Sequence, residues 1–328
     1  MGLNNSIYMY ESLLQLDTVK INFSASGMHI INIILGFIMF GVALDIKPSV
    51  FIDLIKKPKS VIIGLISQVL ALPFITFILV VLLGNFITPT VAMGMILVAA
   101  CPGGNISNFI SSFSKANTEL SVGLTATTTL FATISTPFNF AFWGGLYTNY
   151  INKYSTHVLQ PLVIDNAQMF ETVFILLGIP LILGVLFSKF FPKITKKLFK
   201  PIQILSIVFF IVMIILAFAN NFSLFLKHIY LIFFIVLIHN ALALFTGFGL
   251  SSIFKLPTKD IRTITIETGI QNSGLGLVLL FNPKIFAPDL AIGGMLFITA
   301  WWGIWHIISG LSLAFYWKNK PIKVIENK

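Results

Sequence analysis

Long apolar stretches separated by short polar segments make up most of the chain. A helix needs roughly 20 mainly apolar residues to cross a membrane. Stretches of this kind predict nine spans, near residues 28–45, 60–83, 90–113, 118–145, 170–188, 202–219, 229–253, 262–281 and 289–316. Residues 1–27 are too polar for a span and are predicted to form an interfacial helix or arm. The strongly basic segment from Lys189 to Lys200 is predicted to be a loop. The pattern therefore predicts an all-α polytopic membrane protein.

Two of the predicted spans are interrupted in their middle by glycine and polar residues. The third contains Pro102-Gly103-Gly104, where proline lacks an amide hydrogen and paired glycines favour a non-helical turn. The eighth contains the polar cluster Glu267–Gly274. The span before each interrupted span contains a polar pair in apolar surroundings. These pairs are Ser67-Gln68 before the third span and His239-Asn240 before the eighth. Corresponding interruptions in two halves indicate a transporter built from repeats, and the odd separation of the third and eighth spans makes them inverted.

Composition supports the membrane assignment and excludes several functions. The chain is 57% hydrophobic and 10% charged, whereas soluble proteins carry roughly 25% charged residues. The single cysteine, Cys101, excludes a disulfide framework and cannot form a zinc or redox site alone. The phosphate-binding loop of ATP-driven pumps does not occur in the sequence. In a membrane protein, a net charge of +10 is typical of orientation and lipid contact rather than of nucleic-acid binding.

Basic residues are distributed unevenly between the predicted loops. With the N-terminus outside, the inner segments hold 17 of the 21 lysines and arginines. The outer segments hold Lys20, Lys153, Lys227 and Lys284. The positive-inside rule then predicts an outside N-terminus and a basic cytoplasmic tail at 318–328. A cleavable signal peptide is not expected, because Met1–Asp17 lack basic residues and a clean apolar segment.

Glu267 is the most unusual single residue, because a carboxylate inside an apolar span is costly unless a cation compensates its charge. No lysine or arginine lies within the core of a predicted span. Hard cations prefer cages of oxygen ligands, and Ser121 and Thr125 share one helical face. The predicted oxygen cage consists of Ser107, Asn108, Ser121, Thr125 and Glu267. A protonated structural glutamate or a proton carrier remains an alternative for Glu267.

Other polar residues in the spans have less specific readings. The half-helix that follows Gly104 would aim its amide hydrogens at the midplane, where they suit an anion. Gln68 fits either an interhelical hydrogen bond or a binding site. His239 and His306 are expected to be satisfied polar residues that face the bundle. Three tryptophans near the end of the chain are expected to serve packing or an interface belt: Trp301, Trp302 and Trp305.

Two strings of residues carry a family resemblance. The first is Cys101-Pro102-Gly103-Gly104-x-x-Ser107-Asn108, followed by Leu120-Ser121-x-x-x-Thr125. The second is Glu267-x-Gly269-x-Gln271-Asn272-Ser273-Gly274, followed by Trp305-His306-x-x-Ser309-Gly310. In these strings the chain resembles the bile acid:sodium symporter family, and the similarity extends from about residue 28 to the end.

The resemblance implies a transporter domain at 28–317 with two inverted repeats and two broken helices that cross at mid-membrane. A panel domain would comprise about 28–46 and 170–220, and a core domain about 60–145 and 228–317. The implied first sodium site consists of Ser107, Asn108, Ser121, Thr125 and Glu267. The implied second site consists of Gln68, Glu267, Gln271 and the backbone carbonyls of Thr268 and Ile270. Substrate would meet Asn105 and Asn272 at the crossing, beside Gly104 and Ser273.

The sequence also departs from the family pattern. Many bacterial members have ten spans, whereas this chain lacks the first, as the animal members do. Asn105 occupies a position where relatives also carry small hydroxyl residues, which leaves the substrate open. The related arsenite exporters use a cysteine beside their broken helix, but Cys101 precedes Pro102-Gly103-Gly104 and fits that pattern less well.

Together these features predict a sodium-coupled symporter of the plasma (inner) membrane, not an enzyme. It would bind two sodium ions and a small organic anion, either compact and similar to pantoate, ketopantoate or a ketoacid, or similar to a bile acid. Its expected partners are substrate and membrane lipid, without nucleic acid or an obligate protein partner, so that it would act as a monomer. A proton-coupled carrier that uses Glu267 as its proton site, or a membrane receptor or channel, is the alternative.

Overall fold

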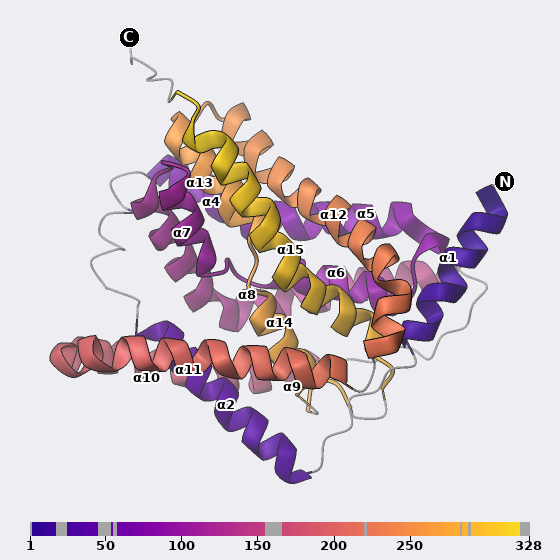
Figure 1. The fold of residues 1–328 in the computed structure, drawn as a ribbon, viewed down its shortest axis with the longest axis horizontal. Coiled ribbons are helices and arrows are strands. Elements are labelled where there is room, and N and C mark those ends of the chain that lie inside the picture. The colour runs from indigo at the N-terminus through magenta and orange to yellow at the C-terminus, as the bar shows by residue number, and fades with distance from the viewer. Residues whose placement is uncertain are drawn as a thin grey trace.

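The fold is a bundle of helices (Figure 1). This computed structural model describes residues 2–17, 25–44, 54, 58–154, 166–219, 222–282, 284–287 and 290–321. Within these ranges no β-strand occurs, and a single isolated β-bridge joins Gly103 to Gln271. The predicted all-α class is confirmed.

The helices, in chain order, are α1 (Gly2–Asp17), α2 (Ala25–Ala43), α4 (Pro58–Leu65), η1 (Ile66–Ala71), α5 (Leu72–Leu83), η2 (Gly84–Phe86), α6 (Pro89–Ala100), α7 (Ile106–Phe113), α8 (Thr118–Tyr154), α9 (Asn166–Val173), η3 (Phe174–Gly178), α10 (Ile179–Phe190), α11 (Pro192–Ala219), α12 (Phe222–Ile253), α13 (Thr258–Gly269), α14 (Ser273–Leu280) and α15 (Gly293–Lys318). The segments η1 and η3 are π-helical, and η2 is a 3₁₀-helix.

Four helices among the described residues are long and apolar enough to cross a membrane. They are Pro58–Phe86, Phe170–Phe190, Leu226–Ile253 and Gly293–Lys318. The two interrupted spans each form a pair of short helices, α6 with α7 and α13 with α14. These short helices have 12 and 8 residues in each pair, so that no half crosses a membrane alone. The count of nine spans and the inverted repeats stay predictions.

The basic segment from Lys189 to Lys200 was predicted as a loop, and this prediction is wrong. Helix α10 ends at Phe190 and α11 begins at Pro192, so that Phe191 alone lies between them. Lysine is a good helix former, and proline at the first position of a helix loses no hydrogen bond. The polar pattern correctly excluded a membrane span here, but it does not exclude a helix.

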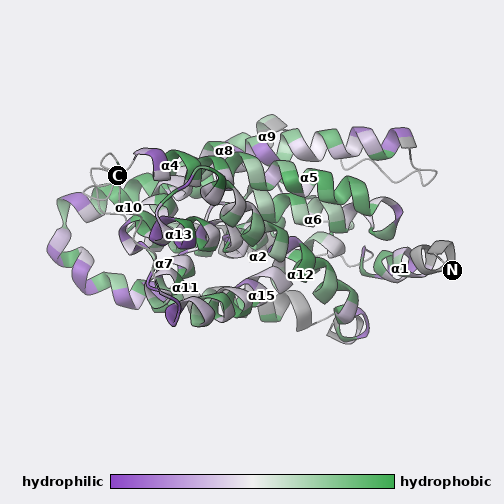
Figure 2. Cartoon of the chain, turned by 90° about the horizontal axis from the view of Figure 1, so that it is seen from above, coloured by the Kyte–Doolittle hydropathy of each residue, from purple (hydrophilic) through white to green (hydrophobic). Residues whose placement is uncertain are grey.

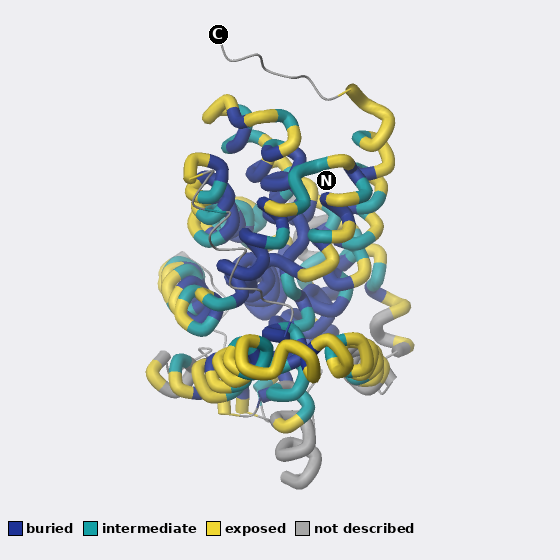
Figure 3. Tube along the Cα trace, turned by 90° about the vertical axis from the view of Figure 1, so that its left-hand side faces the viewer, coloured by how far each residue is buried: buried dark blue, intermediate teal, exposed yellow. Residues whose placement is uncertain are grey.

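Helices α2, α10 and α11 pack against one another and lie along one side of the bundle (Figure 1). On the other side, α6 is buried along its whole length and packs against α15. Burial is concentrated in the middle of the molecule, between outer helices with exposed faces (Figure 3). The predicted panel includes α2, α10 and α11, and its division from a core domain stays a prediction.

Apolar side chains also cover the outside of the bundle. On α8, Phe131, Ile134, Phe138 and Phe142 are all exposed. Hydrophobic residues run along α5 and α8 (Figure 2). Extended apolar surfaces are rare on soluble monomers, and helices that face lipid satisfy their backbone internally. The molecule is therefore built for a lipid environment.

The π-helical turn η1 has a local cause that also positions Gln68. Pro73 lacks the amide hydrogen that would bond the carbonyl of Val69 four residues earlier. Asn139 of α8 supplies the missing donor, with its Nδ2 atom 3.0 Å from the Val69 carbonyl oxygen. Such π-turns are frequent at functional sites. In this chain the turn places Ser67 and Gln68 in the interior, where both are buried.

The predicted N-terminal arm contains a helix, α1, in its described part. Leu13 and Leu16 are fully buried, and α1 packs against α12 and α15. The side chain of Asp17 accepts a hydrogen bond from Thr88 Oγ1 at 3.0 Å, just before α6 begins. Residues 18–24 lie outside the described residues, and the interfacial position of the arm stays a prediction.

Candidate functional site

The two interrupted helices cross, and their backbones pair at the crossing. The amide of Gly104 donates to the carbonyl of Ile270 at 2.8 Å, and the amide of Asn272 donates to the carbonyl of Pro102 at 2.8 Å. Backbone groups that lack partners are costly in a membrane. Because each break satisfies groups of the other, the two breaks stabilise each other. The site is built around this crossing.

Glycine is needed at the crossing because the site side chains approach the backbone closely. A Cβ atom on Gly103 would lie 2.6 Å from Gln68 Nε2 and 2.9 Å from Glu267 Oε2. Both distances are shorter than contacts that real Cβ atoms make. The paired glycines that predicted a turn therefore also leave room for the polar side chains.

Glu267 lies near the end of α13 and is 1% exposed. Its Oε1 atom accepts hydrogen bonds from Ser107 Oγ at 2.5 Å, from Thr125 Oγ1 at 3.1 Å and from Ser121 Oγ. Thr125 Oγ1 also donates to Oε2 at 2.9 Å. Helices α7, α8 and α13 thus each contribute to one oxygen cluster. In the described residues, no lysine or arginine contacts this carboxylate.

Asn108 completes the cluster. Its Oδ1 atom lies 3.0 Å from Ser121 Oγ and 3.3 Å from Thr125 Oγ1. Ser107 Oγ lies 3.2 Å from Thr125 Oγ1. The structure therefore brings together all five residues of the predicted first sodium site. We refer to Ser107, Asn108, Ser121, Thr125 and Glu267 as the carboxylate cluster.

Gln68 and Gln271, predicted for the second sodium site, contact the carbonyls at the end of α13. Gln68 Nε2 donates to the carbonyl of Glu267 at 2.6 Å, and Gln271 Nε2 donates to the carbonyl of Thr268 at 2.9 Å. Both Oε1 atoms are buried and have no hydrogen-bond partner among the described residues. Buried polar atoms without a partner are rare and need an explanation. Two such amide oxygens beside a carboxylate suit a hard cation.

The two predicted carbonyl ligands of this second site already have one partner each. The Thr268 carbonyl accepts from Gln271, and the Ile270 carbonyl accepts from the amide of Gly104. A carbonyl oxygen has two lone pairs, so each retains one acceptor position. We refer to Gln68, Thr268, Ile270 and Gln271 as the amide cluster.

The four residues predicted to meet substrate differ in their surroundings. Asn105 is exposed at the start of α7 and makes no capping bond, whereas Asn272 caps α14 by accepting from the Leu275 amide at 3.0 Å. Gly104 and Ser273 are buried. The amino end of α7 therefore lacks a side-chain cap, and its amides at Ser107 and Asn108 donate to the backbone carbonyls of Gly104 and Asn105.

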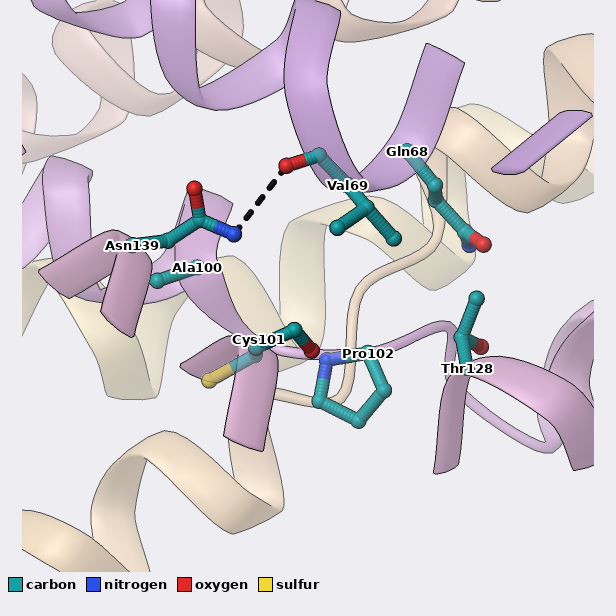
Figure 4. A pocket seen from close by; sticks show the side chains of 8 residues that line it. Gln68, Val69, Ala100, Cys101, Pro102, Thr128 and Asn139 are labelled. Carbon is teal, nitrogen blue, oxygen red and sulfur yellow. Dashed lines mark hydrogen bonds between the residues drawn. The ribbon is translucent and has the colours of Figure 1, made fainter. Parts of the chain in front are cut away.

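Two residues at the site were not singled out by the sequence. Thr128 lies one turn after Thr125 and accepts from the Gly103 amide at 3.4 Å. Asn139 and Thr128 line a small cavity with Gln68 and Cys101 (Figure 4). Thr128 could have been found, because positions 121, 125 and 128 share one helical face. Asn139 could not, because its role depends on a carbonyl 70 positions away.

The histidines and tryptophans behave mostly as packing residues. His239 Nε2 lies 2.8 Å from Thr76 Oγ1, and the His239 ring packs against Trp302 at 4.7 Å between centroids. Trp302 is fully buried. Trp305 packs edge-on against Phe233 at 5.0 Å. The expectation that His239 and His306 are satisfied polar residues is confirmed for the His239 Nε2 atom, whereas the buried Nδ1 atoms of both histidines have no hydrogen-bond partner among the described residues.

A helical bundle with a lipid-facing surface, two crossing interrupted helices and buried oxygen clusters at the crossing has the architecture of a secondary transporter. Residues 32–228 match the Sodium Bile acid symporter family. The chain belongs to this family. It is therefore a multi-pass membrane protein of a sodium-dependent transporter family and not an enzyme.

Relatives support the assignment over most of the chain. The chain is 32% identical over 293 residues to the uncharacterized sodium-dependent transporter YocS of Bacillus subtilis, and the match covers 89% of this chain and 84% of that protein. A probable chloroplastic sodium/metabolite cotransporter of rice, BASS2, is 28% identical over 290 residues, which are 88% of this chain and 64% of that protein. The bovine P3 protein is 26% identical over 242 residues, which are 74% of this chain and 48% of that protein.

Proposed function

We propose that the protein is a symporter that couples the entry of two sodium ions to the uptake of a small organic anion. One observation carries the proposal. Glu267 is buried where hydroxyl, amide and carbonyl oxygens surround it, and two buried amide oxygens beside it lack partners. An ionised carboxylate in such a place needs a cation, and oxygen is the ligand that sodium prefers.

Each cluster would hold one sodium ion. In the carboxylate cluster, sodium would bind the oxygen atoms of Glu267 and Asn108, and the hydroxyl groups would turn their hydrogen atoms away from these two side chains. In the amide cluster, it would bind the free Oε1 atoms of Gln68 and Gln271 and the remaining lone pairs of the Thr268 and Ile270 carbonyls. Glu267 belongs to the carboxylate cluster, and its backbone carbonyl accepts from Gln68 of the amide cluster, so that its charge would be available to both ions.

The charge balance of this site predicts an anionic substrate. Two sodium ions and one ionised Glu267 leave about one net positive charge at the crossing. The uncapped amino end of α7 adds partial positive charge beside Asn105. An anion bound there would raise the affinity for sodium by the same factor by which sodium raises the affinity for the anion.

Transport would follow from movement of the unit that contains the crossing against α2, α10 and α11. The crossing would then face each side of the membrane in turn. We place the protein in the plasma membrane, with its N-terminus outside and its C-terminus in the cytoplasm. The distribution of basic residues supports this orientation.

The substrate class that we propose is a compact organic acid, of the size of pantoate, ketopantoate or a ketoacid, rather than a bile acid. A melting-temperature screen of such acids, with and without sodium, identifies the substrate. A ligand that binds the native state raises its stability, and a true substrate should do so more strongly when sodium is present. The name of the rice relative, a probable sodium/metabolite cotransporter, agrees with this class.

The decisive experiment measures accumulation of the identified anion in proteoliposomes. We expect uptake against the substrate gradient when sodium is high outside, and no uptake when choline replaces sodium. Glu267→Ala should abolish the sodium dependence, while the protein still inserts. Unchanged sodium stimulation in this variant would refute the ion site.

Proton coupling is the second candidate, and one observation favours it. Three partners of the Glu267 side chain, Ser107, Ser121 and Thr125, are hydroxyl groups, which accept a hydrogen bond from a protonated carboxyl as readily as they donate one to a carboxylate. Uptake driven by a pH gradient in sodium-free buffer separates the two functions. Accumulation under these conditions would establish the proton carrier, and its absence would support sodium coupling.

A further inference from the structure

The end of α13 contains one carbonyl whose partner comes from outside both oxygen clusters. A helix leaves its last carbonyls without partners inside the helix. At positions 267 and 268 these carbonyls accept from the two glutamines of the amide cluster. The carbonyl of Gly269 accepts instead from Asn240 Nδ2 of α12, at 2.7 Å.

Asn240 is held in turn by α15. Ser309 Oγ lies 2.5 Å from Asn240 Oδ1, and Asn240 is completely buried. The orientation of this amide follows from its two partners. A carbonyl can only accept, so the amide nitrogen must face Gly269, and the amide oxygen is left to accept from the Ser309 hydroxyl. The three groups form a chain across α13, α12 and α15.

Helices α12 and α13 lie so close together that the short side chain of Asn240 reaches the Gly269 carbonyl. A Cβ atom on Gly247 of α12 would lie 2.7 Å from the carbonyl oxygen of Ile264. A Cβ atom on Gly269 would collide with the side chain of Leu244. With two glycines in the contact, the helix backbones approach closely and Asn240 reaches the end of α13 directly.

We propose that Asn240, oriented by Ser309, is a positioning residue for sodium at the amide cluster. This inference rests on the proposed function. Gln68 and Gln271 would contact the ion through their free Oε1 atoms. Asn240 would not contact the ion, and its Nδ2 atom bonds the Gly269 carbonyl. This bond holds Gly269 in place, and with it the flanking carbonyls of Thr268 and Ile270 that would face the ion.

The test is a sodium titration of the melting temperature of the purified protein in detergent, with choline chloride keeping the ionic strength constant. We expect Asn240→Ala to raise the half-saturating sodium concentration about tenfold. Asn240→Asp should raise it at least as much, because a carboxylate oxygen would then face the Gly269 carbonyl. Ser309→Ala should give a smaller increase, of about threefold, and Ser309→Thr should restore the wild-type value because it keeps the hydroxyl.

Ser312→Ala is the matched control. This residue lies on the same helix, and within the described part of the chain its hydroxyl bonds only the carbonyl of Ile308. A wild-type sodium titration in Asn240→Ala, while the native protein responds to sodium, would overturn the positioning role and leave the proposed function intact. A native protein without any response to sodium would overturn both. If Asn240→Ala does not fold, equal half-saturating concentrations in Ser309→Ala and Ser309→Thr would overturn the positioning role.

Discussion

Gly103→Ala tests the ion site by adding a single methyl group. The new Cβ atom would lie 2.6 Å from Gln68 Nε2 and 2.9 Å from Glu267 Oε2. Ordinary contacts begin near 3.4 Å. Gln68 must therefore move by about 0.8 Å and the Glu267 carboxylate by about 0.5 Å. A functional site keeps its geometry only within about 0.5 Å, so the first displacement exceeds this tolerance and the second reaches it. One residue of each cluster is displaced.

The cost of overpacking a close-packed site is typically about 1–3 kcal/mol. Because the displaced groups are the predicted sodium ligands, we expect most of this cost to appear as weaker sodium binding. A change of 1.4 kcal/mol corresponds to a tenfold change in a dissociation constant, so sodium affinity should fall by roughly 10-fold to 100-fold. Gly103 does not have a positive φ angle, and alanine therefore adds no backbone strain.

The assay is again the melting temperature of the purified protein as a function of sodium concentration, which needs no knowledge of the substrate. Gly145→Ala is the matched control, because no heavy atom lies within 4 Å of a Cβ at this position. A Gly103→Ala variant that melts normally without sodium, but needs much more sodium for stabilisation, would agree with the reasoning. Wild-type sodium dependence in this variant would refute it.

Three further predictions concern other parts of the molecule. Glu267→Gln should lower sodium affinity by at least 100-fold, measured by sodium titration, and a loss of under threefold would contradict the site. Asn139→Ala leaves the Val69 carbonyl without its donor and should lower the free energy of unfolding by about 1–3 kcal/mol, measured in detergent; an unchanged value would show that water replaces the donor. Burial raises the pKa of Asp17 from 3.8 to about 6, so the native state binds the proton more tightly than the unfolded state. The free energy of unfolding should therefore fall by about 3 kcal/mol as the pH rises from about 4 to about 6, because the unfolded state loses this proton first. Asp17→Asn should abolish this fall in pH-dependent melting, whereas Glu11→Gln, at an exposed carboxylate, should keep it.

The helices and their interruptions were predictable because they depend on local chemistry. Apolar stretches long enough for a membrane predicted where helices occur, and Pro102 with its glycines predicted one break. The basic segment 189–200 was misjudged, because charge excludes a span but lysine also forms helices well. The boundary between helix and loop at the membrane surface is therefore poorly determined by hydropathy.

The residues of the carboxylate cluster were also predictable, since a buried Glu267 requires a partner and few polar residues occur in the predicted spans. Their convergence was a prediction from the residue types and the family resemblance, and the hydrogen bonds confirm that they meet. That these oxygens bind sodium stays a prediction.

By itself, the sequence determined which residues are polar inside the membrane and where the helices break, because burial cost and missing amide hydrogens act within one segment. Tertiary structure alone decided what the polar residues contact. Asn139 supplies a donor to Val69, Asn240 holds Gly269, and the two breaks pair through Gly104 and Asn272. Each of these contacts joins segments far apart in the chain, and no local pattern encodes such a distance.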